Sequence, residues 1–386
     1  MLRAMLRANF LRFGALVLAG MAMLSAQSVA FAQANDGALS EADTKAYEAA
    51  VQKGIDYLRA KGQSADGAYS GNVGPGVTAI VTTAILRNGR TADDPLVAKS
   101  LKYLEGFVQP DGGIYAPKSR LRNYETCLGM VCFKAANADG RFDKILKHAD
   151  KFLKGLQFNE ANDKNPDDVA YGGVGYSGAE RPDLSNTHFL VDALEAAGDS
   201  ANDVAVQKAL VFISRCQNLE STHNTTKFPA KNPDGGFYYT PIGEGGSPAG
   251  KTAEGGLRSY GSMSYAGLKS MIFAGLTADD PRVKAAITWA QQHYSLTENP
   301  GLGDGGLYYY YHLFAKALDA LDQPTLTDAK GKVHNWRAEL IEELARRQQP
   351  DGSWVNSNSR WLEGDPNLVT GYALLTLSYC RPMAKK

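Results

Sequence analysis

The sequence repeats one unit along most of its length, and this repeat constrains the fold more than any other feature. Each unit begins with an amphipathic helix, passes through a glycine-rich turn and ends with a helix that is apolar on nearly all sides. In the first unit, Val51, Ile55 and Leu58 have the helical spacing of a half-buried face. The turns combine glycine with Asp or Tyr at positions 66–67, 111–113, 171–173, 234–236, 304–306 and 351–353.

Six helices of each kind are predicted. The amphipathic ones should begin near Ala42, Pro95, Phe142, Asn202, Pro281 and Val333, and the apolar ones should span 76–90, 121–137, 184–197, 260–275, 307–321 and 366–380. A helix that is apolar all round must be buried all round. An inner ring of six apolar helices within an outer ring of six amphipathic ones satisfies this requirement, and repeated hairpins let a long chain build one core. We therefore predict an all-α fold, an α/α toroid, with residues 42–382 as a single domain.

Residues 1–32 have the features of a signal peptide. Arg3, Arg7 and Arg12 precede an apolar stretch at 13–24, and small residues at positions 30 and 32 provide a cleavage site. The apolar stretch is shorter than the ~20 residues of a membrane-spanning helix. We expect export to the periplasm or the extracellular space, no transmembrane span after cleavage, and a short linker at 33–41.

Charge and cysteine content narrow the possible partners. Lys and Arg together number 41, and Asp and Glu together also number 41, so the net charge is zero. The chain therefore lacks the basic excess of a nucleic-acid-binding protein. The four cysteines form no CxxC pair or Cys/His cluster, so we expect no metal site and no cofactor. Disulfide formation by Cys216 or Cys380 stays open, as does a protein partner.

Two turns carry a motif that resembles a known family. Residues 349–354, Gln-Pro-Asp-Gly-Ser-Trp, look like the Gln-Trp repeat motif of squalene cyclases, and residues 109–115 are a degenerate copy. With the helix rhythm, residues 45–382 resemble the terpenoid cyclase and protein prenyltransferase superfamily, which has prenyltransferase and squalene oxidase repeats. The resemblance implies an α/α toroid with a central cavity.

The catalytic motifs of that superfamily are not retained. Squalene–hopene cyclases have a Pro-Asp-x-Asp-Asp-Thr segment whose middle Asp protonates the substrate, and Ser185 stands at that position in the matching stretch 182–188. Protein prenyltransferases bind zinc through an Asp-x-Cys pair and a later His. Gly261 and Met263 occupy the pair's positions, so a match at His312 alone would not hold a metal.

In such a ring the inner helices run parallel, and their N-terminal turns meet at one mouth. We predict Tyr124, Glu125, Tyr265, Tyr309 and Trp354 as ligand-binding residues there. An aromatic wall suits an isoprenoid or a carbocation, whereas tyrosine hydroxyls also suit a sugar or a peptide. The aromatic residues that cluster in turns and helix starts are Tyr171, Tyr176, Phe237, Tyr238, Tyr239, Tyr260, Tyr265, Tyr308, Tyr309, Tyr310, Tyr311, Trp354 and Trp361.

Three residues are candidates for acid–base chemistry, namely Asp183, His188 and His312. His188 and Asp192 share a helix face, which fits either an oriented general base or a core histidine. His312 begins a polar stripe with Lys316 and Asp319 that is either a structural network or a cavity wall.

The leading hypothesis is an exported, terpenoid-cyclase-like protein that binds an extended apolar, isoprenoid-like ligand in a central cavity. One alternative is a carbohydrate-active α/α-barrel enzyme, a lyase or glycosidase, that uses Glu125 and Asp183 as paired carboxylates. The other is a non-catalytic binding scaffold. For Glu125, an ordinary ion pair with Arg122 is a further interpretation.

Overall fold

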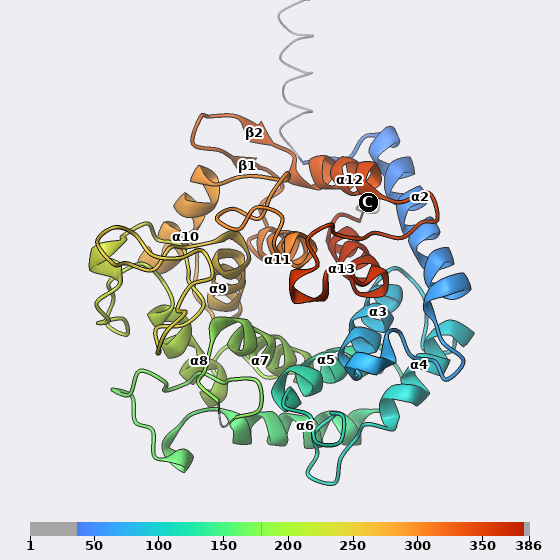
Figure 1. Ribbon diagram of the computed structural model, residues 1–386, viewed down its shortest axis with the longest axis horizontal. Coiled ribbons are helices and arrows are strands. Elements are labelled where there is room, and N and C mark those ends of the chain that lie inside the picture. The colour runs from blue at the N-terminus through green and yellow to red at the C-terminus, as the bar shows by residue number, and fades with distance from the viewer. Residues whose placement is uncertain (1–36, 179, 382–386) are drawn as a thin grey trace, which may run out of the picture.

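The computed structural model describes residues 37–178 and 180–381, so the predicted signal peptide and residues 33–36 of the predicted linker lie outside the described residues. Two concentric rings of helices form the fold (Figure 1). Each inner helix packs against the next, and α13 packs against α3 to close the ring. The inner helices are α3 (Gly76–Arg87), α5 (Arg122–Ala135), α7 (Leu184–Ala197), α9 (Gly261–Phe273), α11 (Leu307–Ala320) and α13 (Pro366–Tyr379).

The outer ring lies around these helices, as Figure 1 shows. It consists of α2 (Glu41–Tyr57), α4 (Pro95–Glu105), α6 (Asp143–Leu156), α8 (Val204–Arg215), α10 (Pro281–Gln292) and α12 (Trp336–Arg347). The predicted α/α toroid is thereby confirmed. None of the helices in the described ranges combines the length and apolar character that crossing a membrane requires.

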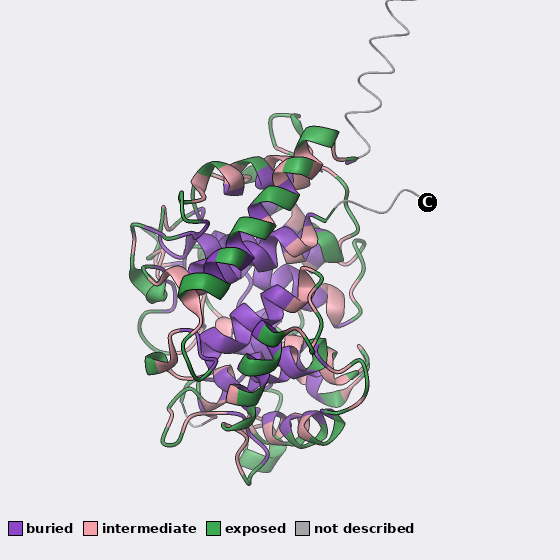
Figure 2. Ribbon diagram, turned by 90° about the vertical axis from the view of Figure 1, so that its right-hand side faces the viewer, coloured by how far each residue is buried: buried purple, intermediate pink, exposed green. Residues whose placement is uncertain are grey.

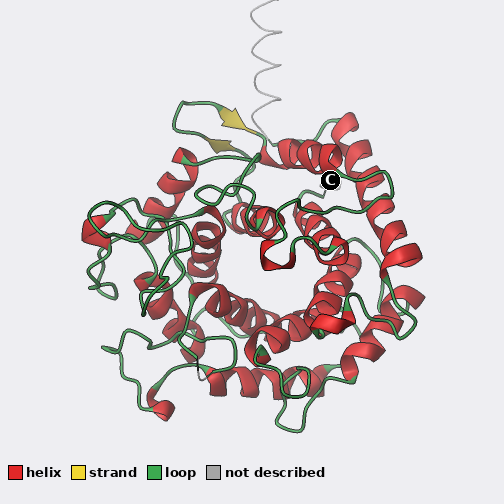
Figure 3. Ribbon diagram, in the orientation of Figure 1, coloured by secondary structure: helices red, strands yellow, loops and turns green. Residues whose placement is uncertain are grey.

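Loops and short elements connect the rings (Figure 3). They include η1 (Leu58–Gly62), η2 (Gly71–Val73), η3 (Glu160–Asn162), η4 (Pro229–Lys231) and η5 (Arg360–Leu362). The expected start of a helix near Val333 was wrong. Strand β2 (Val333–His334) pairs there with β1 (Leu326–Thr327), and Asn335, the residue directly after β2, caps α12. The side chain of Asn335 accepts the N–H of Ala338, which sets the start of the helix.

Burial separates the two rings as the hydrophobic pattern predicts (Figure 2). In α3, every residue from Gly76 to Ile85 is buried. In α6 the buried residues are Leu146, Ala149 and Leu153, which lie along one face. The four cysteines are also buried, and none forms a disulfide within the described residues.

The glycine-rich turns dock onto the outer helices, and this contact explains the repeat. Gly172 has φ +82°, and a Cβ there would lie 1.8 Å from the carbonyl oxygen of Lys208 in α8. Gly352 has φ +92°, and its Cβ would lie 2.3 Å from the carbonyl oxygen of Lys53 in α2. Only glycine fits such a left-handed, crowded position. The last turn of the chain thus packs on its first described helix and closes the outer ring.

The same turns are tied to the inner ring by hydroxyl groups. The backbone N–H of Val174 donates to Thr187 Oγ1 at 3.2 Å, and that of Trp354 donates to Thr370 Oγ1 at 3.1 Å. Equivalent bonds join Tyr69 to Thr78, Ile114 to Thr126 and Phe237 to Ser264. These five turns therefore fix the N-terminal ends of five inner helices relative to the outer helices, which positions the site described next.

Candidate functional site

A cavity of about 650 Å³ opens where the N-terminal turns of the inner helices meet. The prediction of a shared mouth is thus confirmed. Residues from all six inner helices and from the loops near their N-terminal ends line it: Val73, Gly76, Val77, Leu121, Tyr124, Glu125, Tyr176, Ser185, Phe189, Tyr239, Gly245, Ser247, Pro248, Tyr260, Ser262, Met263, Gly306, Tyr309, Arg360, Trp361, Leu362, Glu363, Leu368 and Tyr372. Tyr124, Glu125 and Tyr309 are predicted ligand-binding residues that lie in this wall.

Aromatic rings form a continuous part of the wall. Tyr124 packs edge-on against Phe189 with ring centroids 5.2 Å apart, and Phe189 stacks with Tyr309 at 6.2 Å. Tyr309 also contacts the ring of Tyr372 at 5.8 Å. These four rings belong to α5, α7, α11 and α13, so residues far apart in the sequence build one apolar surface.

The segment η5 covers part of the mouth. Trp361 and Leu362 both have left-handed backbones, with φ 55° and 67°, which large side chains adopt at a cost in free energy. The Trp361 ring lies over Gly306, where a Cβ would be 3.2 Å from it. Large apolar residues remain exposed around this rim, namely Val73, Leu121, Tyr176, Trp361 and Leu362. In the sequence, Trp361 is distinguished only as one of many aromatic residues in turns and helix starts.

Glu125 lies in the wall and is almost fully buried. Its Oε2 accepts the backbone N–H of Ala116 at 2.9 Å, and burial raises the pKa of its carboxyl group. Arg122 instead donates to the carbonyl of Ser177 and lies over the ring of Tyr115. The ion pair between Glu125 and Arg122 is therefore absent from the described part of the chain.

Glu363 is a second carboxyl group of the wall, and it is not among the site residues predicted from the sequence. Its oxygens accept the backbone N–H groups of Tyr308 at 3.3 Å and Tyr309 at 2.8 Å, and the amide of Asn356 at 2.7 Å. It caps α11, which begins after Gly306 and so has no side-chain cap of its own. Burial raises the pKa of Glu363. No local pattern reveals this role, because Glu363 belongs to the following loop.

Asp183 lies behind the wall as the N-terminal cap of α7. Its side chain accepts the backbone N–H of Asn186 at 2.8 Å and the amide of the same residue at 2.9 Å. Burial raises the pKa of Asp183 to about 6. Tyr239, a residue of the wall, also lies close enough to interact electrostatically with the Asp183 carboxyl group.

A chain of polar side chains begins in the wall and leads away from the cavity. Ser185 Oγ and Tyr309 Oη lie 3.2 Å apart, and Tyr309 Oη is 2.5 Å from Nε2 of His188. His188 Nδ1 lies 3.8 Å from Asp192 Oδ2. Asp192 in turn contacts Lys269 at 2.6 Å and Lys316 at 2.8 Å. His188 is thus brought next to both Asp192 and the wall, although its ring is fully buried.

A second cavity of about 560 Å³ lies at the C-terminal ends of the inner helices. Asp192, Lys316 and Asp319 are among its lining residues. His312 lies between the rings of Tyr372 and Tyr379, with centroid distances of 6.1 and 5.9 Å, and lines neither cavity. Burial, together with Lys316, holds the pKa of His312 well below its ordinary value.

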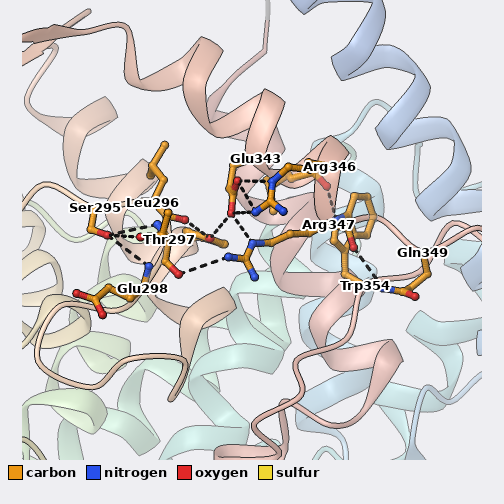
Figure 4. A network of polar contacts seen from close by, with 11 residues as sticks. Ser295, Leu296, Thr297, Glu298, Glu343, Arg346, Arg347, Gln349 and Trp354 are labelled. Carbon is orange, nitrogen blue, oxygen red and sulfur yellow. Dashed lines mark hydrogen bonds and ion pairs between the residues drawn. The ribbon is translucent and has the colours of Figure 1, made fainter.

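Two predicted ligand-binding residues lie away from the cavity. Tyr265 packs against Tyr310 and Phe314 in the core between α9 and α11. Trp354 donates from Nε1 to the carbonyl of Leu344 at 2.8 Å. Figure 4 shows Trp354 beside the polar network of the outer ring, in which Glu343 pairs with two arginines. Among the described residues, no group of three or more His, Cys, Asp or Glu is arranged to hold a metal ion.

No protein-family model and no curated protein matches the sequence. Solved structures do. The type II terpene cyclase MstE from Scytonema, without ligand, is 11% identical, with 88% of this chain and 99% of that chain covered and a TM-score of 0.53. The chain has a terpenoid cyclase-like fold.

Two further structures of MstE variants share this terpenoid cyclase-like fold. A variant in complex with its product, merosterolic acid A, is 13% identical over 90% of this chain and all of that chain, with a TM-score of 0.51. A variant in complex with its substrate, geranylgeranyl dihydroxybenzoate, is 12% identical over 89% of this chain and 99% of that chain, with a TM-score of 0.50. At these identities the likeness establishes the terpenoid cyclase-like fold alone, and an activity has to be argued from the residues of the site.

Proposed function

We propose that this protein binds an extended, apolar, isoprenoid-like molecule in the cavity at the inner-helix N-termini. The composition of the wall carries the proposal, because aliphatic and aromatic side chains make up most of the lining of a cavity of about 650 Å³. That volume lies within the roughly 300–1,000 Å³ of small-molecule sites. The terpenoid cyclase-like fold supports the same ligand class, since MstE variants were crystallised with a geranylgeranyl substrate and a terpenoid product.

The wall supports binding better than it supports cyclisation. Ser185 lies in the wall, at the position where the resemblance places a proton-donating Asp. A serine hydroxyl is far too weak an acid to protonate an alkene. The two carboxyl groups of the wall, Glu125 and Glu363, both accept backbone N–H groups, so these oxygens are already engaged by the protein itself.

The wall also favours an apolar ligand over a carbohydrate. Glycosidases need two carboxyl groups about 5–9.5 Å apart with oxygens free to reach the sugar. Asp183 uses its oxygens to cap α7, and Glu363 uses its oxygens to cap α11. These carboxylates hold the helices of the site in place.

Ligand binding can be tested on the purified protein that starts at residue 33. Native mass spectrometry and thermal shift with squalene, farnesol and geranylgeraniol should show a bound isoprenoid and a raised melting temperature. Val73→Trp, which fills the rim, should weaken binding at least about tenfold, because a bulky side chain there obstructs entry. Val204→Trp, on the exposed outer helix α8, is the matched control. Absence of any shift with all three isoprenoids would overturn the proposal.

We further propose that the protein is exported, on the support of the basic, apolar and small-residue segments of residues 1–32. Residues 1–40 fused to alkaline phosphatase, which becomes active only outside the cytoplasm, should yield active enzyme. The same fusion without residues 13–24 is the control. Equal phosphatase activity in both fusions would contradict export.

A further inference from the structure

The position of one proton in the polar chain at the cavity wall bears on which ligand the cavity accepts. The chain runs from Ser185 through Tyr309 and His188 to Asp192, with heavy-atom distances of 3.2, 2.5 and 3.8 Å. Ser185 and Tyr309 both line the cavity and are partly exposed to it. His188 and Asp192 lie behind them, away from the ligand space.

The charge on Asp192 selects the tautomer of His188. Although burial opposes its ionisation, Lys269 and Lys316 hold the pKa of Asp192 well below its ordinary value. The Nδ1 atom of His188 faces this anion. A neutral imidazole carries a single N–H, and placing it on Nδ1 points a donor rather than a lone pair at the carboxylate. The Nε2 atom of His188 is then an acceptor.

The charges around His188 also keep the ring neutral. Burial, with Lys269 and Lys316 nearby, lowers the pKa of His188 to about 4, although Asp192 acts in the opposite direction. Nε2 therefore has no proton to donate at neutral pH. The short contact between Nε2 and Tyr309 Oη must be a hydrogen bond in which the tyrosine donates.

It follows that Tyr309 presents only oxygen lone pairs to the cavity. A phenol has one proton, and this one is directed to His188. Ser185, 3.2 Å away, has a hydroxyl that can donate to a ligand oxygen or accept from it. Together the two residues match a ligand hydroxyl, which donates to Tyr309 and accepts from Ser185.

The charges of the wall disfavour an anionic head group. The ionisable side chains that line the described cavity, tyrosines aside, are Glu125, Glu363 and Arg360. Arg360 is exposed at the rim, where its guanidinium stacks on Trp361 at 4.1 Å. A diphosphate would meet two carboxylates and no buried cation, so it would lose its hydration without compensation.

On these grounds, and resting on the proposed function, we propose that the ligand is an isoprenoid alcohol whose hydroxyl group donates a hydrogen bond to Tyr309 Oη and accepts one from Ser185. Tyr309 and Ser185 would thus be the residues that select an alcohol over an ether, a hydrocarbon or a diphosphate.

The test compares the affinities of geranylgeraniol, its methyl ether and geranylgeranyl diphosphate by titration of tryptophan fluorescence. The wild-type protein should bind the alcohol about 5–10-fold more tightly than the ether, as expected for one lost hydrogen bond, and the diphosphate most weakly. Tyr309→Phe should bring the alcohol-to-ether ratio close to one. Tyr308→Phe, the same change at the neighbouring residue outside the cavity, should leave the ratio as in the wild type.

Ser185→Ala provides a second variant with little risk to folding, because the Ser185 side chain makes no hydrogen bond except that with Tyr309 among the described residues. It should reduce the ratio to an intermediate value. Equal binding of alcohol and ether by the wild type, or tightest binding of the diphosphate, would overturn this inference and leave isoprenoid binding intact. Failure of the wild type to bind any of the three would instead overturn the proposed function.

Discussion

Oε1 of Glu363 accepts the backbone N–H of Tyr309 at 2.8 Å, although 53 residues separate the two in the chain. The loop before α13 thereby caps the N-terminus of α11, next to the cavity. Glu363→Ala should lower the free energy of unfolding by about 2–3 kcal/mol, because it leaves buried N–H donors without acceptors. Glu363→Gln keeps an acceptor and should cost less than about 1.5 kcal/mol. Urea unfolding measures both.

Glu298→Ala removes an exposed carboxylate and serves as the control. It should change stability by less than about 0.5 kcal/mol. An equally small effect of Glu363→Ala would show that the cap contributes little to α11.

Gly172→Ala tests the docking of the glycine-rich turns. A Cβ would meet the carbonyl oxygen of Lys208 at 1.8 Å on a left-handed backbone, so the turn would have to move from α8. We expect a loss of about 3 kcal/mol or more in the free energy of unfolding. Gly198→Ala shares the positive φ but has no atom within 4 Å of the added Cβ, and should cost only about 1–2 kcal/mol. Similar losses in both variants, measured by thermal or urea unfolding, would refute the docking contact.

Asp183 should make the protein less stable as the pH rises. Its pKa is raised to about 6 in the folded state from an ordinary 3.8, so the folded state binds the proton more tightly and loses this advantage between about pH 4 and 6. Asp183→Asn does not titrate and can still cap α7. Relative to the wild type, the variant should gain roughly 2–3 kcal/mol between about pH 4 and 7. A pH-independent difference in unfolding free energy would contradict the buried, raised carboxyl group.

His188 should make the protein less stable as the pH falls. Its pKa falls from an ordinary 6.5 to about 4 in the folded state, so the unfolded chain binds the proton more tightly and the protein loses stability as the pH falls through this window. His188→Gln removes this contribution. The stability of the wild type relative to the variant should therefore decline by roughly 2–3 kcal/mol from about pH 7 to pH 4. His148→Gln, at an exposed histidine, is the matched control for the substitution itself.

The helices could be predicted because their signals are local. The burial of α3 from Gly76 to Ile85 follows from an unbroken run of small and apolar residues, and the face of α6 follows from the spacing of Leu146, Ala149 and Leu153. The pairing of His188 with Asp192 was also readable, since residues four apart share a helix face. The start of α12 was missed because the preceding residues pair as strands with a segment earlier in the chain.

The wall of the cavity was only partly predictable. Tyr124, Glu125 and Tyr309 lie in it because each stands near the start of an inner helix, and that position can be counted along the sequence. Tyr265 also stands near the start of an inner helix, and Trp354 belongs to the Gln-Trp motif, yet both rings pack into the core instead of facing the cavity. The direction of a side chain depends on its neighbours in space, which periodicity does not specify.

The sequence alone determined a ring of paired helices, since helix period, glycine turns and all-round apolar faces admit few other solutions. The tertiary structure decided which groups meet inside the ring. Glu363 reaches α11, and Tyr309 meets His188, through contacts between segments 50 or more residues apart. The physical reason is that hydrophobic periodicity fixes which face of a helix is buried, whereas hydrogen-bond partners and proton positions depend on atoms brought together only when the ring closes.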